Sequence, residues 1–203
     1  MRKILYKLGC VLSVICSPIV NIYHKLCNYI RVGYKTRGMH AISMPITIHK
    51  NVRIVGVEKM SFGKNITIDR DTTLYSRGES YNSDVKLSIG NDCSIGQGCH
   101  ITAANSITLG NGVLLGKYVT ITDNSHGKVS SEEYDVKPIS RLVFSKGKVH
   151  ISDNVWIGDK ATILPNVKIG EGAIIGANSV VTTDIPAGCV AAGIPARIIK
   201  KYH

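Results

Sequence analysis

Aromatic residues are scarce in this sequence: they make up 6% of its 203 residues, with one tryptophan and two phenylalanines. This scarcity disfavours a core built on large aromatic rings. The 20 glycines instead favour a fold with many tight corners and thin aliphatic packing. Hydrophobic residues make up 44% and charged residues 19%, which is typical of a globular chain with one sizeable core.

The sequence also lacks the cysteine spacings of metal and redox sites. Its six cysteines include no Cys-x-x-Cys pair and no metal-like Cys/His pattern. We interpret them as reduced thiols, and we expect a cytoplasmic protein with no metal.

Acidic residues are outnumbered, with 14 Asp and Glu against 25 Lys and Arg and a formal charge of +11. This balance favours an anionic partner, such as nucleic acid, a membrane surface or a phosphorylated small molecule. The basic residues are scattered and few aromatics interleave with them. We therefore expect no nucleic acid partner.

Residues 1–35 form a predicted N-terminal helical segment. Their aliphatic residues are spaced by three and four positions: Leu5, Leu8, Leu12, Ile15, Ile19, Ile22 and Leu26. Pro18 removes a backbone donor and clashes with the preceding turn, so Ser17-Pro18 predicts a new N-terminus. We expect two short helices, one before Ser17 and one from Pro18 to about Ile30.

Two interpretations of this segment are open. One is peripheral membrane contact through residues 1–31, helped by Arg2, Lys3, Lys7, Lys25 and Arg31. The other is packing over one end of the domain or in a subunit interface. A true membrane span is disfavoured because Pro18 and Asn21 interrupt the apolar run.

Beyond residue 45 a period of six appears. Aliphatic residues occupy one register from Ile151 to Val181: Ile151, Ile157, Ile163, Ile169, Ile175 and Val181. Shifted registers hold Ile89, Ile95 and Ile101, and before them Phe62, Ile68 and Leu74. Small or β-branched residues commonly follow four positions later, and glycine commonly follows directly, as in Ile157-Gly158.

A period of six fits one short strand and one corner per repeat, so that three repeats close a triangular coil. Successive coils then stack by parallel strand pairing, roughly 4.8 Å apart, with the aliphatic residues filling the interior. Each coil buries its face only against its neighbours. The repeat therefore predicts an all-β fold, a parallel β-helix, preceded by the short helical segment.

The stretch Val155–Gly188 resembles the hexapeptide-repeat acetyltransferases, in particular the galactoside/maltose and capsule or O-antigen O-acetyltransferase branch. The tail Ala192–Lys200 is similar to the same family's C-terminal signature. The resemblance implies a left-handed β-helix over residues 45–188 and a C-terminal tail at 189–203. It also implies a homotrimer that binds acetyl-CoA between neighbouring subunits.

The repeat is interrupted near Ser76–Val85 and, at greater length, by a loop at residues 123–149. Loops that leave a rigid repeat commonly carry function. Acetyl transfer to a hydroxyl needs a base, and histidine titrates near neutrality. His126 lies where the loop leaves the repeat and matches the family's catalytic histidine. Asp123, Glu132, Glu133 or a backbone carbonyl could orient it.

The resemblance implies further site residues. For the cofactor it implies Trp156, Asp159, Ala177, Thr182, Thr183, Arg197 and Lys200. Arg197 and Lys200 would meet phosphates, and at Asp159 a backbone N–H would serve the oxyanion. Asp123 and Asn124 are expected to contact the substrate. The family's acceptor-binding asparagine has no clear match, since Gly96 or Gly98 lies there, so simple galactosides are disfavoured.

We expect a saccharide hydroxyl as acceptor, because no nucleotide-binding or long helical domain precedes the repeat. Three alternatives remain. The first is N-acetylation of an amino sugar. The second is a carbonic-anhydrase-like zinc enzyme using His100, His126 and His150. The third is a non-catalytic scaffold.

Overall fold

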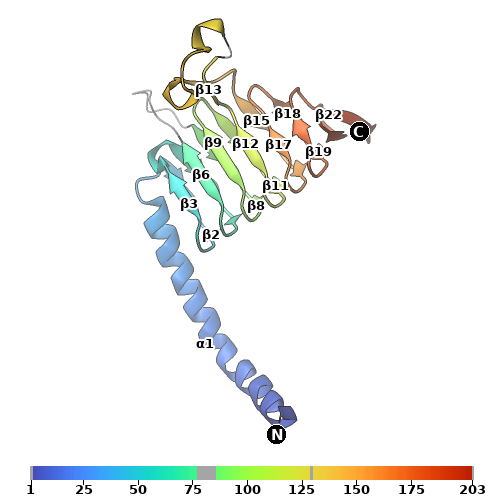
Figure 1. Cartoon of the computed structure of the whole chain (residues 1–203). Helices are drawn as coiled ribbons and strands as arrows, with labels where there is room; N and C mark the ends of the chain where they lie inside the picture. Colours follow the sequence, from blue (N-terminus) through green and yellow to red (C-terminus); the bar gives the residue numbers. More distant parts are fainter. Residues whose placement is uncertain (1, 77–85, 129, 203) are drawn as a thin grey trace.

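The computed structural model describes residues 2–76, 86–128 and 130–202. These residues form one long N-terminal helix, α1 (Arg2–Thr36), followed by a parallel β-helix. Figure 1 shows α1 running away from one end of the stacked coils, while the C-terminus lies at the other end.

The coils form three sheets. Sheet A has the order β1 (Ala41–Ile42), β4 (Met60–Phe62), β7 (Leu87–Ile89), β10 (Ile107–Leu109), β15 (Val149–Ile151) and β18 (Lys168–Ile169). Sheet B has the order β2 (Ile46–Ile48), β5 (Ile66–Ile68), β8 (Ser94–Ile95), β11 (Leu114–Leu115), β16 (Trp156–Ile157), β19 (Ile174–Ile175), β21 (Cys189–Gly193) and β22 (Ala196–Lys201). Sheet C has the order β20 (Val180–Val181), β17 (Thr162–Ile163), β12 (Thr120–Thr122), β9 (His100–Ala103), β6 (Thr73–Ser76) and β3 (Arg53–Val55).

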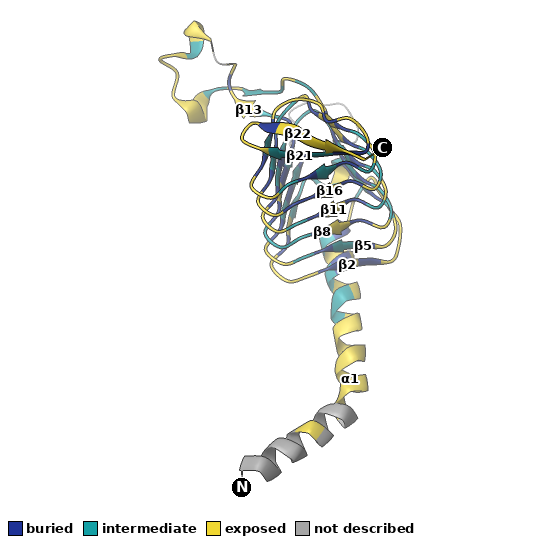
Figure 2. Cartoon of the chain, turned by 90° about the vertical axis from the view of Figure 1, so that its right-hand side faces the viewer, coloured by how far each residue is buried: buried dark blue, intermediate teal, exposed yellow. Residues whose placement is uncertain are grey.

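The aliphatic repeat positions stack directly above one another inside the coils. Ile151 pairs with Ile169 in sheet A, Ile157 with Ile175 in sheet B, and Ile163 with Val181 in sheet C, all in parallel ladders. All six side chains are buried. In Figure 2 the dark blue buried residues follow the strands, while the turns are largely exposed. The predicted parallel β-helix is therefore confirmed.

The glycine that follows the aliphatic residue is required by the close packing of successive coils. At Gly96 a Cβ atom would lie 2.4 Å from the carbonyl oxygen of Gly116 in the next coil. Gly96 is absent from the residues with positive φ, so close approach of two backbones, not an unusual conformation, requires glycine here. The left-handed corner positions are other residues, mostly either asparagine and aspartate, as at Asn154 and Asp92, or further glycines, as at Gly98 and Gly112.

Cys93 and Cys99 occupy the small-residue position and are buried. Each thiol donates a hydrogen bond of 3.1 Å to a carbonyl of the next coil, that of Gly110 for Cys93 and that of Gly116 for Cys99. Burial raises the pKa of Cys99 to about 11, so its thiol stays protonated and inert at neutral pH.

The shifts of register in the repeat all occur at one edge of the prism. We call the turns that lead from a strand of sheet C to the next strand of sheet A the C/A corner. From Ile101 to Leu109 the chain takes eight positions instead of six, and from Ile121 to Ile151 it takes thirty. Between sheets A and B and between sheets B and C, the steps stay at six. Most of the predicted interruption at Ser76–Val85, namely residues 77–85, lies outside the described residues.

The expectation of two N-terminal helices is wrong. Residues Arg2–Thr36 form one helix with Pro18 inside it. In the sequence, the three-and-four spacing of apolar residues stays in phase across Pro18, from Ile15 to Ile22. One lost backbone hydrogen bond at Pro18 does not change that phase.

The C-terminal part of α1 covers the open edge of sheet B. The Asn28 side chain donates to the carbonyl of Ile46 at 3.0 Å and accepts from the N–H of Ile48 at 3.0 Å. Arg31 donates to the carbonyl of Ile48 at 2.6 Å, and Val32 is buried against the first coil. Polar side chains of the helix thus take the place of the strand that would otherwise pair with β2.

The contact between coils predicts the effect of a single methyl group. Gly96→Ala should lower the free energy of unfolding by about 1–3 kcal/mol, because the added Cβ has no space against the backbone of Gly116. Thermal or urea unfolding followed by circular dichroism measures this change. The matched control is Gly33→Ala in α1, where a Cβ meets nothing within 4 Å. Equal stability of Gly96→Ala and the control would contradict the proposed close packing.

Candidate functional site

The long interruption at the C/A corner is an ordered excursion. It leaves the coil after β12, forms β13 (Ser125–His126), and returns through β14 (Val143–Phe144), which pairs antiparallel with β13. Between them lie two short 3-10 helices, Ser131–Glu133 and Pro138–Ser140. The N–H of Gly127 donates to the carbonyl of Leu142 at 2.9 Å and extends the pairing of the two strands. The excursion projects from the stack at the top of Figure 1.

His126 lies at the root of this excursion and is exposed. Its backbone is held by the strand pairing opposite Val143. Two of the expected orienting carboxylates are bonded elsewhere: Asp123 is buried, and Glu133 accepts from the backbone N–H of Lys128 at 2.5 Å. Among the described residues no hydrogen bond to the His126 ring occurs, so its orienting group stays undetermined.

Asp123 holds the corner from which the excursion leaves. Its buried carboxylate accepts hydrogen bonds from the backbone N–H groups of Ala104, Asn105 and Ser106 at 2.7–2.8 Å. It also accepts from the side chain of Asn124 at 2.9 Å. That Asn124 amide reaches the carbonyl of Thr102 as well, at 2.9 Å. The expected substrate contacts of Asp123 and Asn124 stay predictions, but in this chain both side chains bind the coil beneath them.

A groove opens at the C/A corner of the last coils. It contains Thr182 and Thr183, both expected to contact the cofactor, and both are exposed. Its other residues are Lys148, His150, Asn166, Val167, Lys168 and Asp184. Two lysines and two hydroxyl groups make it a candidate anion site, although Asp184 contributes one carboxylate. The Asp184 carboxylate accepts from the backbone N–H of Lys168 at 2.7 Å.

The remaining expected cofactor residues lie elsewhere on the prism, around sheet B and its corner with sheet C. Trp156 is in β16 with half its surface exposed, between Leu114 and Ile174 in register. Ala177 is exposed at the turn after β19. The Asp159 carboxylate accepts from the N–H of Lys117 at 2.8 Å, so it ties two coils together at this corner.

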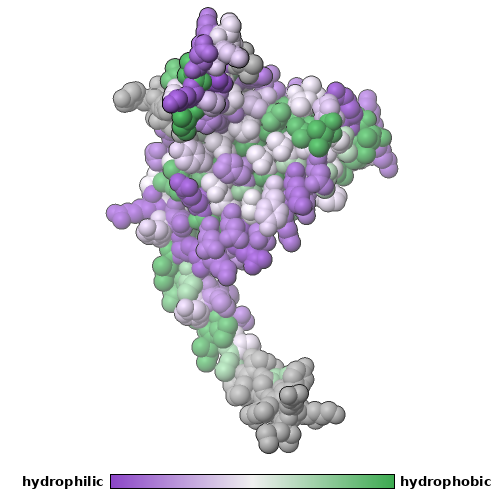
Figure 3. All heavy atoms as spheres, viewed as in Figure 1, coloured by the Kyte–Doolittle hydropathy of each residue, from purple (hydrophilic) through white to green (hydrophobic). Residues whose placement is uncertain are grey.

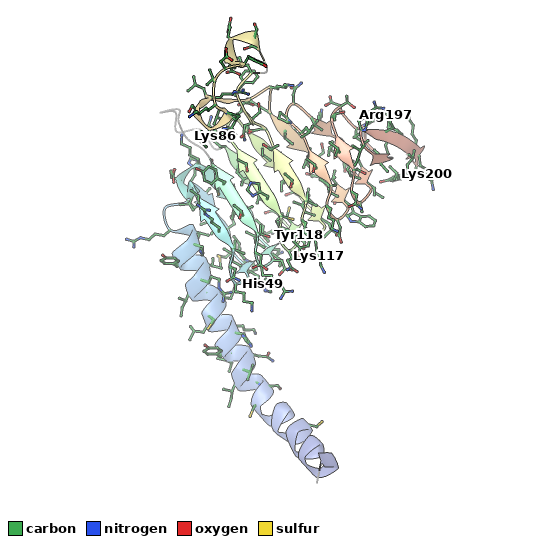
Figure 4. The ribbon with its side chains drawn as sticks, in the orientation of Figure 1. His49, Lys86, Lys117, Tyr118, Arg197 and Lys200 are labelled. Atoms are coloured by element: carbon green, nitrogen blue, oxygen red, sulfur yellow. The ribbon has the colours of Figure 1, made fainter. Side chains whose placement is uncertain are left out.

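Arg197 and Lys200 lie on β22, the outer strand of the C-terminal hairpin, and both are exposed. Figure 4 shows them at the end of the stack opposite α1. The hairpin pairs β21 with β19, so the tail extends sheet B rather than hanging free. The Arg197 guanidinium donates to the carbonyl of Ala196 at 2.9 Å, which leaves its remaining donors available.

One chain therefore divides the expected residues into two groups. His126, Thr182 and Thr183 lie at the C/A corner, whereas Trp156 and Ala177 lie with the hairpin residues around sheet B. Sequence reasoning missed Lys148 and Lys168 and considered His150 only as a zinc ligand, yet all three line the groove beside Thr182. The sequence does contain a signal for this groove, because His150 and Lys168 are outward-facing neighbours in the six-residue register.

The three histidines of the zinc alternative are distributed over separate elements. His100 is on β9 of sheet C, where its ring lies 2.8 Å from the Thr102 hydroxyl, and His150 is on β15 of sheet A. In residues 2–76, 86–128 and 130–202 no group of three potential metal ligands occurs.

Comparison with known families finds two matches within the repeat. The bacterial transferase hexapeptide family, described by six repeats, matches residues 148–183. The hexapeptide repeat of succinyl-transferase matches residues 86–123. The two matched segments flank the excursion that begins after Thr122, so both lie in the regular coils.

Curated relatives match part of the chain. An Escherichia coli (strain K12) protein named as a lipopolysaccharide biosynthesis O-acetyl transferase, WbbJ, is 43% identical over 89 residues, which cover 42% of this chain and 45% of that protein. The galactoside O-acetyltransferase of the same strain is 49% identical over 55 residues, 27% of each chain. The matches thus span less than half the length of these relatives.

Solved structures match over most of the chain. AntD, an N-acyltransferase from Bacillus cereus, superposes with a TM-score of 0.70 at 22% identity and covers 85% of this chain and 88% of its own. A maltose O-acetyltransferase from Clostridium difficile 630 superposes with a TM-score of 0.53 at 27% identity and covers 82% of this chain and 70% of its own. The expected left-handed form of the β-helix is thereby confirmed. The chain therefore carries hexapeptide repeats of the bacterial transferase type at residues 86–123 and 148–183, and it is similar to acetyltransferases in sequence and in fold.

Proposed function

We propose that this protein is an acetyl-CoA-dependent O-acetyltransferase that transfers an acetyl group to a hydroxyl of a saccharide or surface glycan. The observation that carries the proposal is His126 at the root of the only long excursion from the described coils, on the same corner as a groove of lysines and threonines. The names of the O-acetyltransferase relatives support the reaction class and the saccharide acceptor.

In the proposed reaction His126 is the general base. Its imidazole takes the proton of the acceptor hydroxyl as the oxygen attacks the thioester carbonyl carbon. The tetrahedral intermediate collapses, the C–S bond breaks, and the imidazolium returns the proton to the CoA thiolate. Exposure of His126 leaves its ring accessible to a large acceptor.

The groove residues suit the phosphates of acetyl-CoA. Lys148 and Lys168 supply positive charge, while Thr182 and Thr183 supply hydroxyl donors. Arg197 and Lys200 offer a second basic surface on the hairpin. The row of apolar side chains formed by Leu114, Trp156 and Ile174 on sheet B suits the pantetheine arm and the acetyl group.

The division of these residues over two sides of one prism supports a site shared between copies. We therefore propose a homotrimer in which His126 of one subunit faces the Trp156 side of its neighbour. A closed ring of three repeats the same contact at each interface. The chemistry needs a cellular supply of acetyl-CoA, in keeping with the expected cytoplasmic location.

Asp123 acts as a positioning residue in this proposal. Its three backbone hydrogen bonds fix the corner of the coil beneath, and the next residues lead directly to His126. The carboxylate therefore sets where the excursion leaves the coil, without touching the reacting atoms.

Replacing the proposed base should abolish most of the turnover. We expect His126→Ala to reduce kcat by about 10²–10⁴-fold, measured as acceptor-dependent release of the CoA thiol. The matched control is His100→Ala, another exposed histidine, on the outer face of sheet C. Unchanged kcat in a folded His126→Ala protein would rule out the base. Hydroxylamine sensitivity of the product separates an ester from the amide expected of an amino-sugar N-acetyltransferase.

A shared site predicts complementation between two inactive variants. His126→Ala and Trp156→Ala should each lose activity alone, yet mixed trimers should regain it. If the two variants mix at random, about a quarter of the subunit interfaces combine an intact His126 with an intact Trp156. Thiol release from co-expressed, differently tagged chains measures the recovery. Sedimentation of the wild-type protein as a monomer, or no recovery in verified mixed trimers, would contradict the shared site.

Removing the charge at the corner should affect stability and activity together. In Asp123→Asn one oxygen is replaced by an amide group that faces backbone donors, so we expect a loss of about 1–3 kcal/mol in unfolding free energy. We also expect kcat to fall more than KM rises, because His126 is displaced. Urea unfolding and steady-state kinetics measure both quantities. Asp135→Asn, which changes an exposed carboxylate on the excursion, serves as the control. Wild-type stability of Asp123→Asn would exclude the positioning role.

A further inference from the structure

Helix α1 packs on the β-helix with its polar side. Asn28 and Arg31 bond the edge strand β2, and Val32 and Thr36 are buried beside them. An amphipathic helix of a globular domain ordinarily turns its apolar face to the core. Here the arrangement is reversed: most of the apolar face points away from the coils, and only Tyr29 at its edge lies beside Pro45 and Ile46.

We define the free face of α1 as Ile19, Ile22, Tyr23, Leu26, Tyr29 and Ile30. These residues follow one another by three and four positions, so they share one side of the helix. Their exposed fractions run from 57% for Leu26 to 70% for Ile19, so the described part of the chain does not cover them. Figure 2 shows this stretch of α1 in the yellow of exposed residues, and Figure 3 shows hydrophobic residues over it.

The charge around the free face is of one sign. The first acidic residue of the sequence is Glu58, whereas nine of the 25 lysines and arginines precede it. Lys25 and Arg37 are exposed on or next to α1. An apolar face flanked by cations alone matches the surface of an anionic lipid bilayer, which accepts both.

Two further features favour a membrane surface over pairing of helices between copies. The free face carries Tyr23 and Tyr29, which have an apolar ring and a polar hydroxyl suited to the headgroup region. Pairing of copies through this face would lack ion pairs between the helices, because α1 carries basic residues but no acidic residue. In the described part of the chain no helix is long and apolar enough to cross a bilayer.

We infer that α1 lies in the headgroup region of an anionic membrane through its free face, while its polar side holds the β-helix. This inference concerns the attachment of the protein and is independent of acetyl transfer. The two sequence-based interpretations of residues 1–35 then apply to opposite sides of one helix.

Vesicle flotation of the full chain tests the inference. The wild-type protein should float with vesicles of phosphatidylcholine and phosphatidylglycerol and at least tenfold less with phosphatidylcholine alone. Raising the salt from 0.1 to 0.5 M should weaken binding several-fold, because charge attraction is screened. The variant Ile19→Gln/Ile22→Gln/Leu26→Gln should lose at least tenfold in binding, since glutamine preserves helix propensity but removes apolar area.

The matched control is Tyr134→Gln/Ile139→Gln/Leu142→Gln. It removes three similarly exposed apolar side chains from the 123–149 excursion and should bind like the wild type. Equal loss in both variants, or wild-type binding that ignores lipid charge, would overturn the inference. Sedimentation velocity supplies the competing outcome. If the wild type ignores vesicles and the helix variant lowers the oligomeric state, the free face pairs copies of the chain instead.

Discussion

The close approach of stacked backbones is the constraint on which this structure depends. Successive coils lie within hydrogen-bonding distance along all three sheets, so each turn must match the shape of the turns above and below it. The contact between Gly96 and the backbone of Gly116 shows how little room is left. Aspartate and asparagine side chains reinforce the stack at the corners. The Asp153 carboxylate, for example, accepts from the N–H of Asn111, which lowers the pKa of that carboxyl group.

This constraint explains why functional features gather at one edge. Two of the three corners keep the six-residue step, and their turns tie one coil to the next through residues such as Asp159. The C/A corner alone departs from that step, with eight positions from Ile101 to Leu109 and thirty from Ile121 to Ile151. A rigid prism with one variable edge can hold a long excursion without disturbing its core. Asp123 illustrates how the excursion is anchored. Its carboxylate accepts a hydrogen bond from Asn105 in the C/A corner of the coil below, while its own segment of chain turns outward.

The features that could be predicted from sequence were those that repeat. Interior positions such as Ile157 and Ile175 recur at a fixed interval, so strand, sheet and core followed together. Handedness came only from resemblance. Features determined by contacts between distant segments could not be predicted: the bonds of Asp123 to residues 104–106, and those of Asn28 to β2. The helix break predicted at Pro18 is wrong because the local preference of proline was considered alone. The apolar spacing stays in phase on both sides of Pro18, as one continuous helix requires. The N-terminal cations were recognised in the sequence, whereas the absence of acidic residues before Glu58 was overlooked.

The Asn28 side chain also bears on the length of the assembly. A coil whose interior repeats has no intrinsic stopping point, since each new strand offers the same donors and acceptors as the last. The free edge of β2 could in principle accept the end of another molecule, and end-to-end addition would build a filament. The Asn28 amide occupies the hydrogen-bonding positions on β2 that a neighbouring strand would use, and α1 lies across the same edge. This edge of sheet B therefore cannot accept another strand. Sheet B thereby ends at β2, although its repeat could be extended indefinitely.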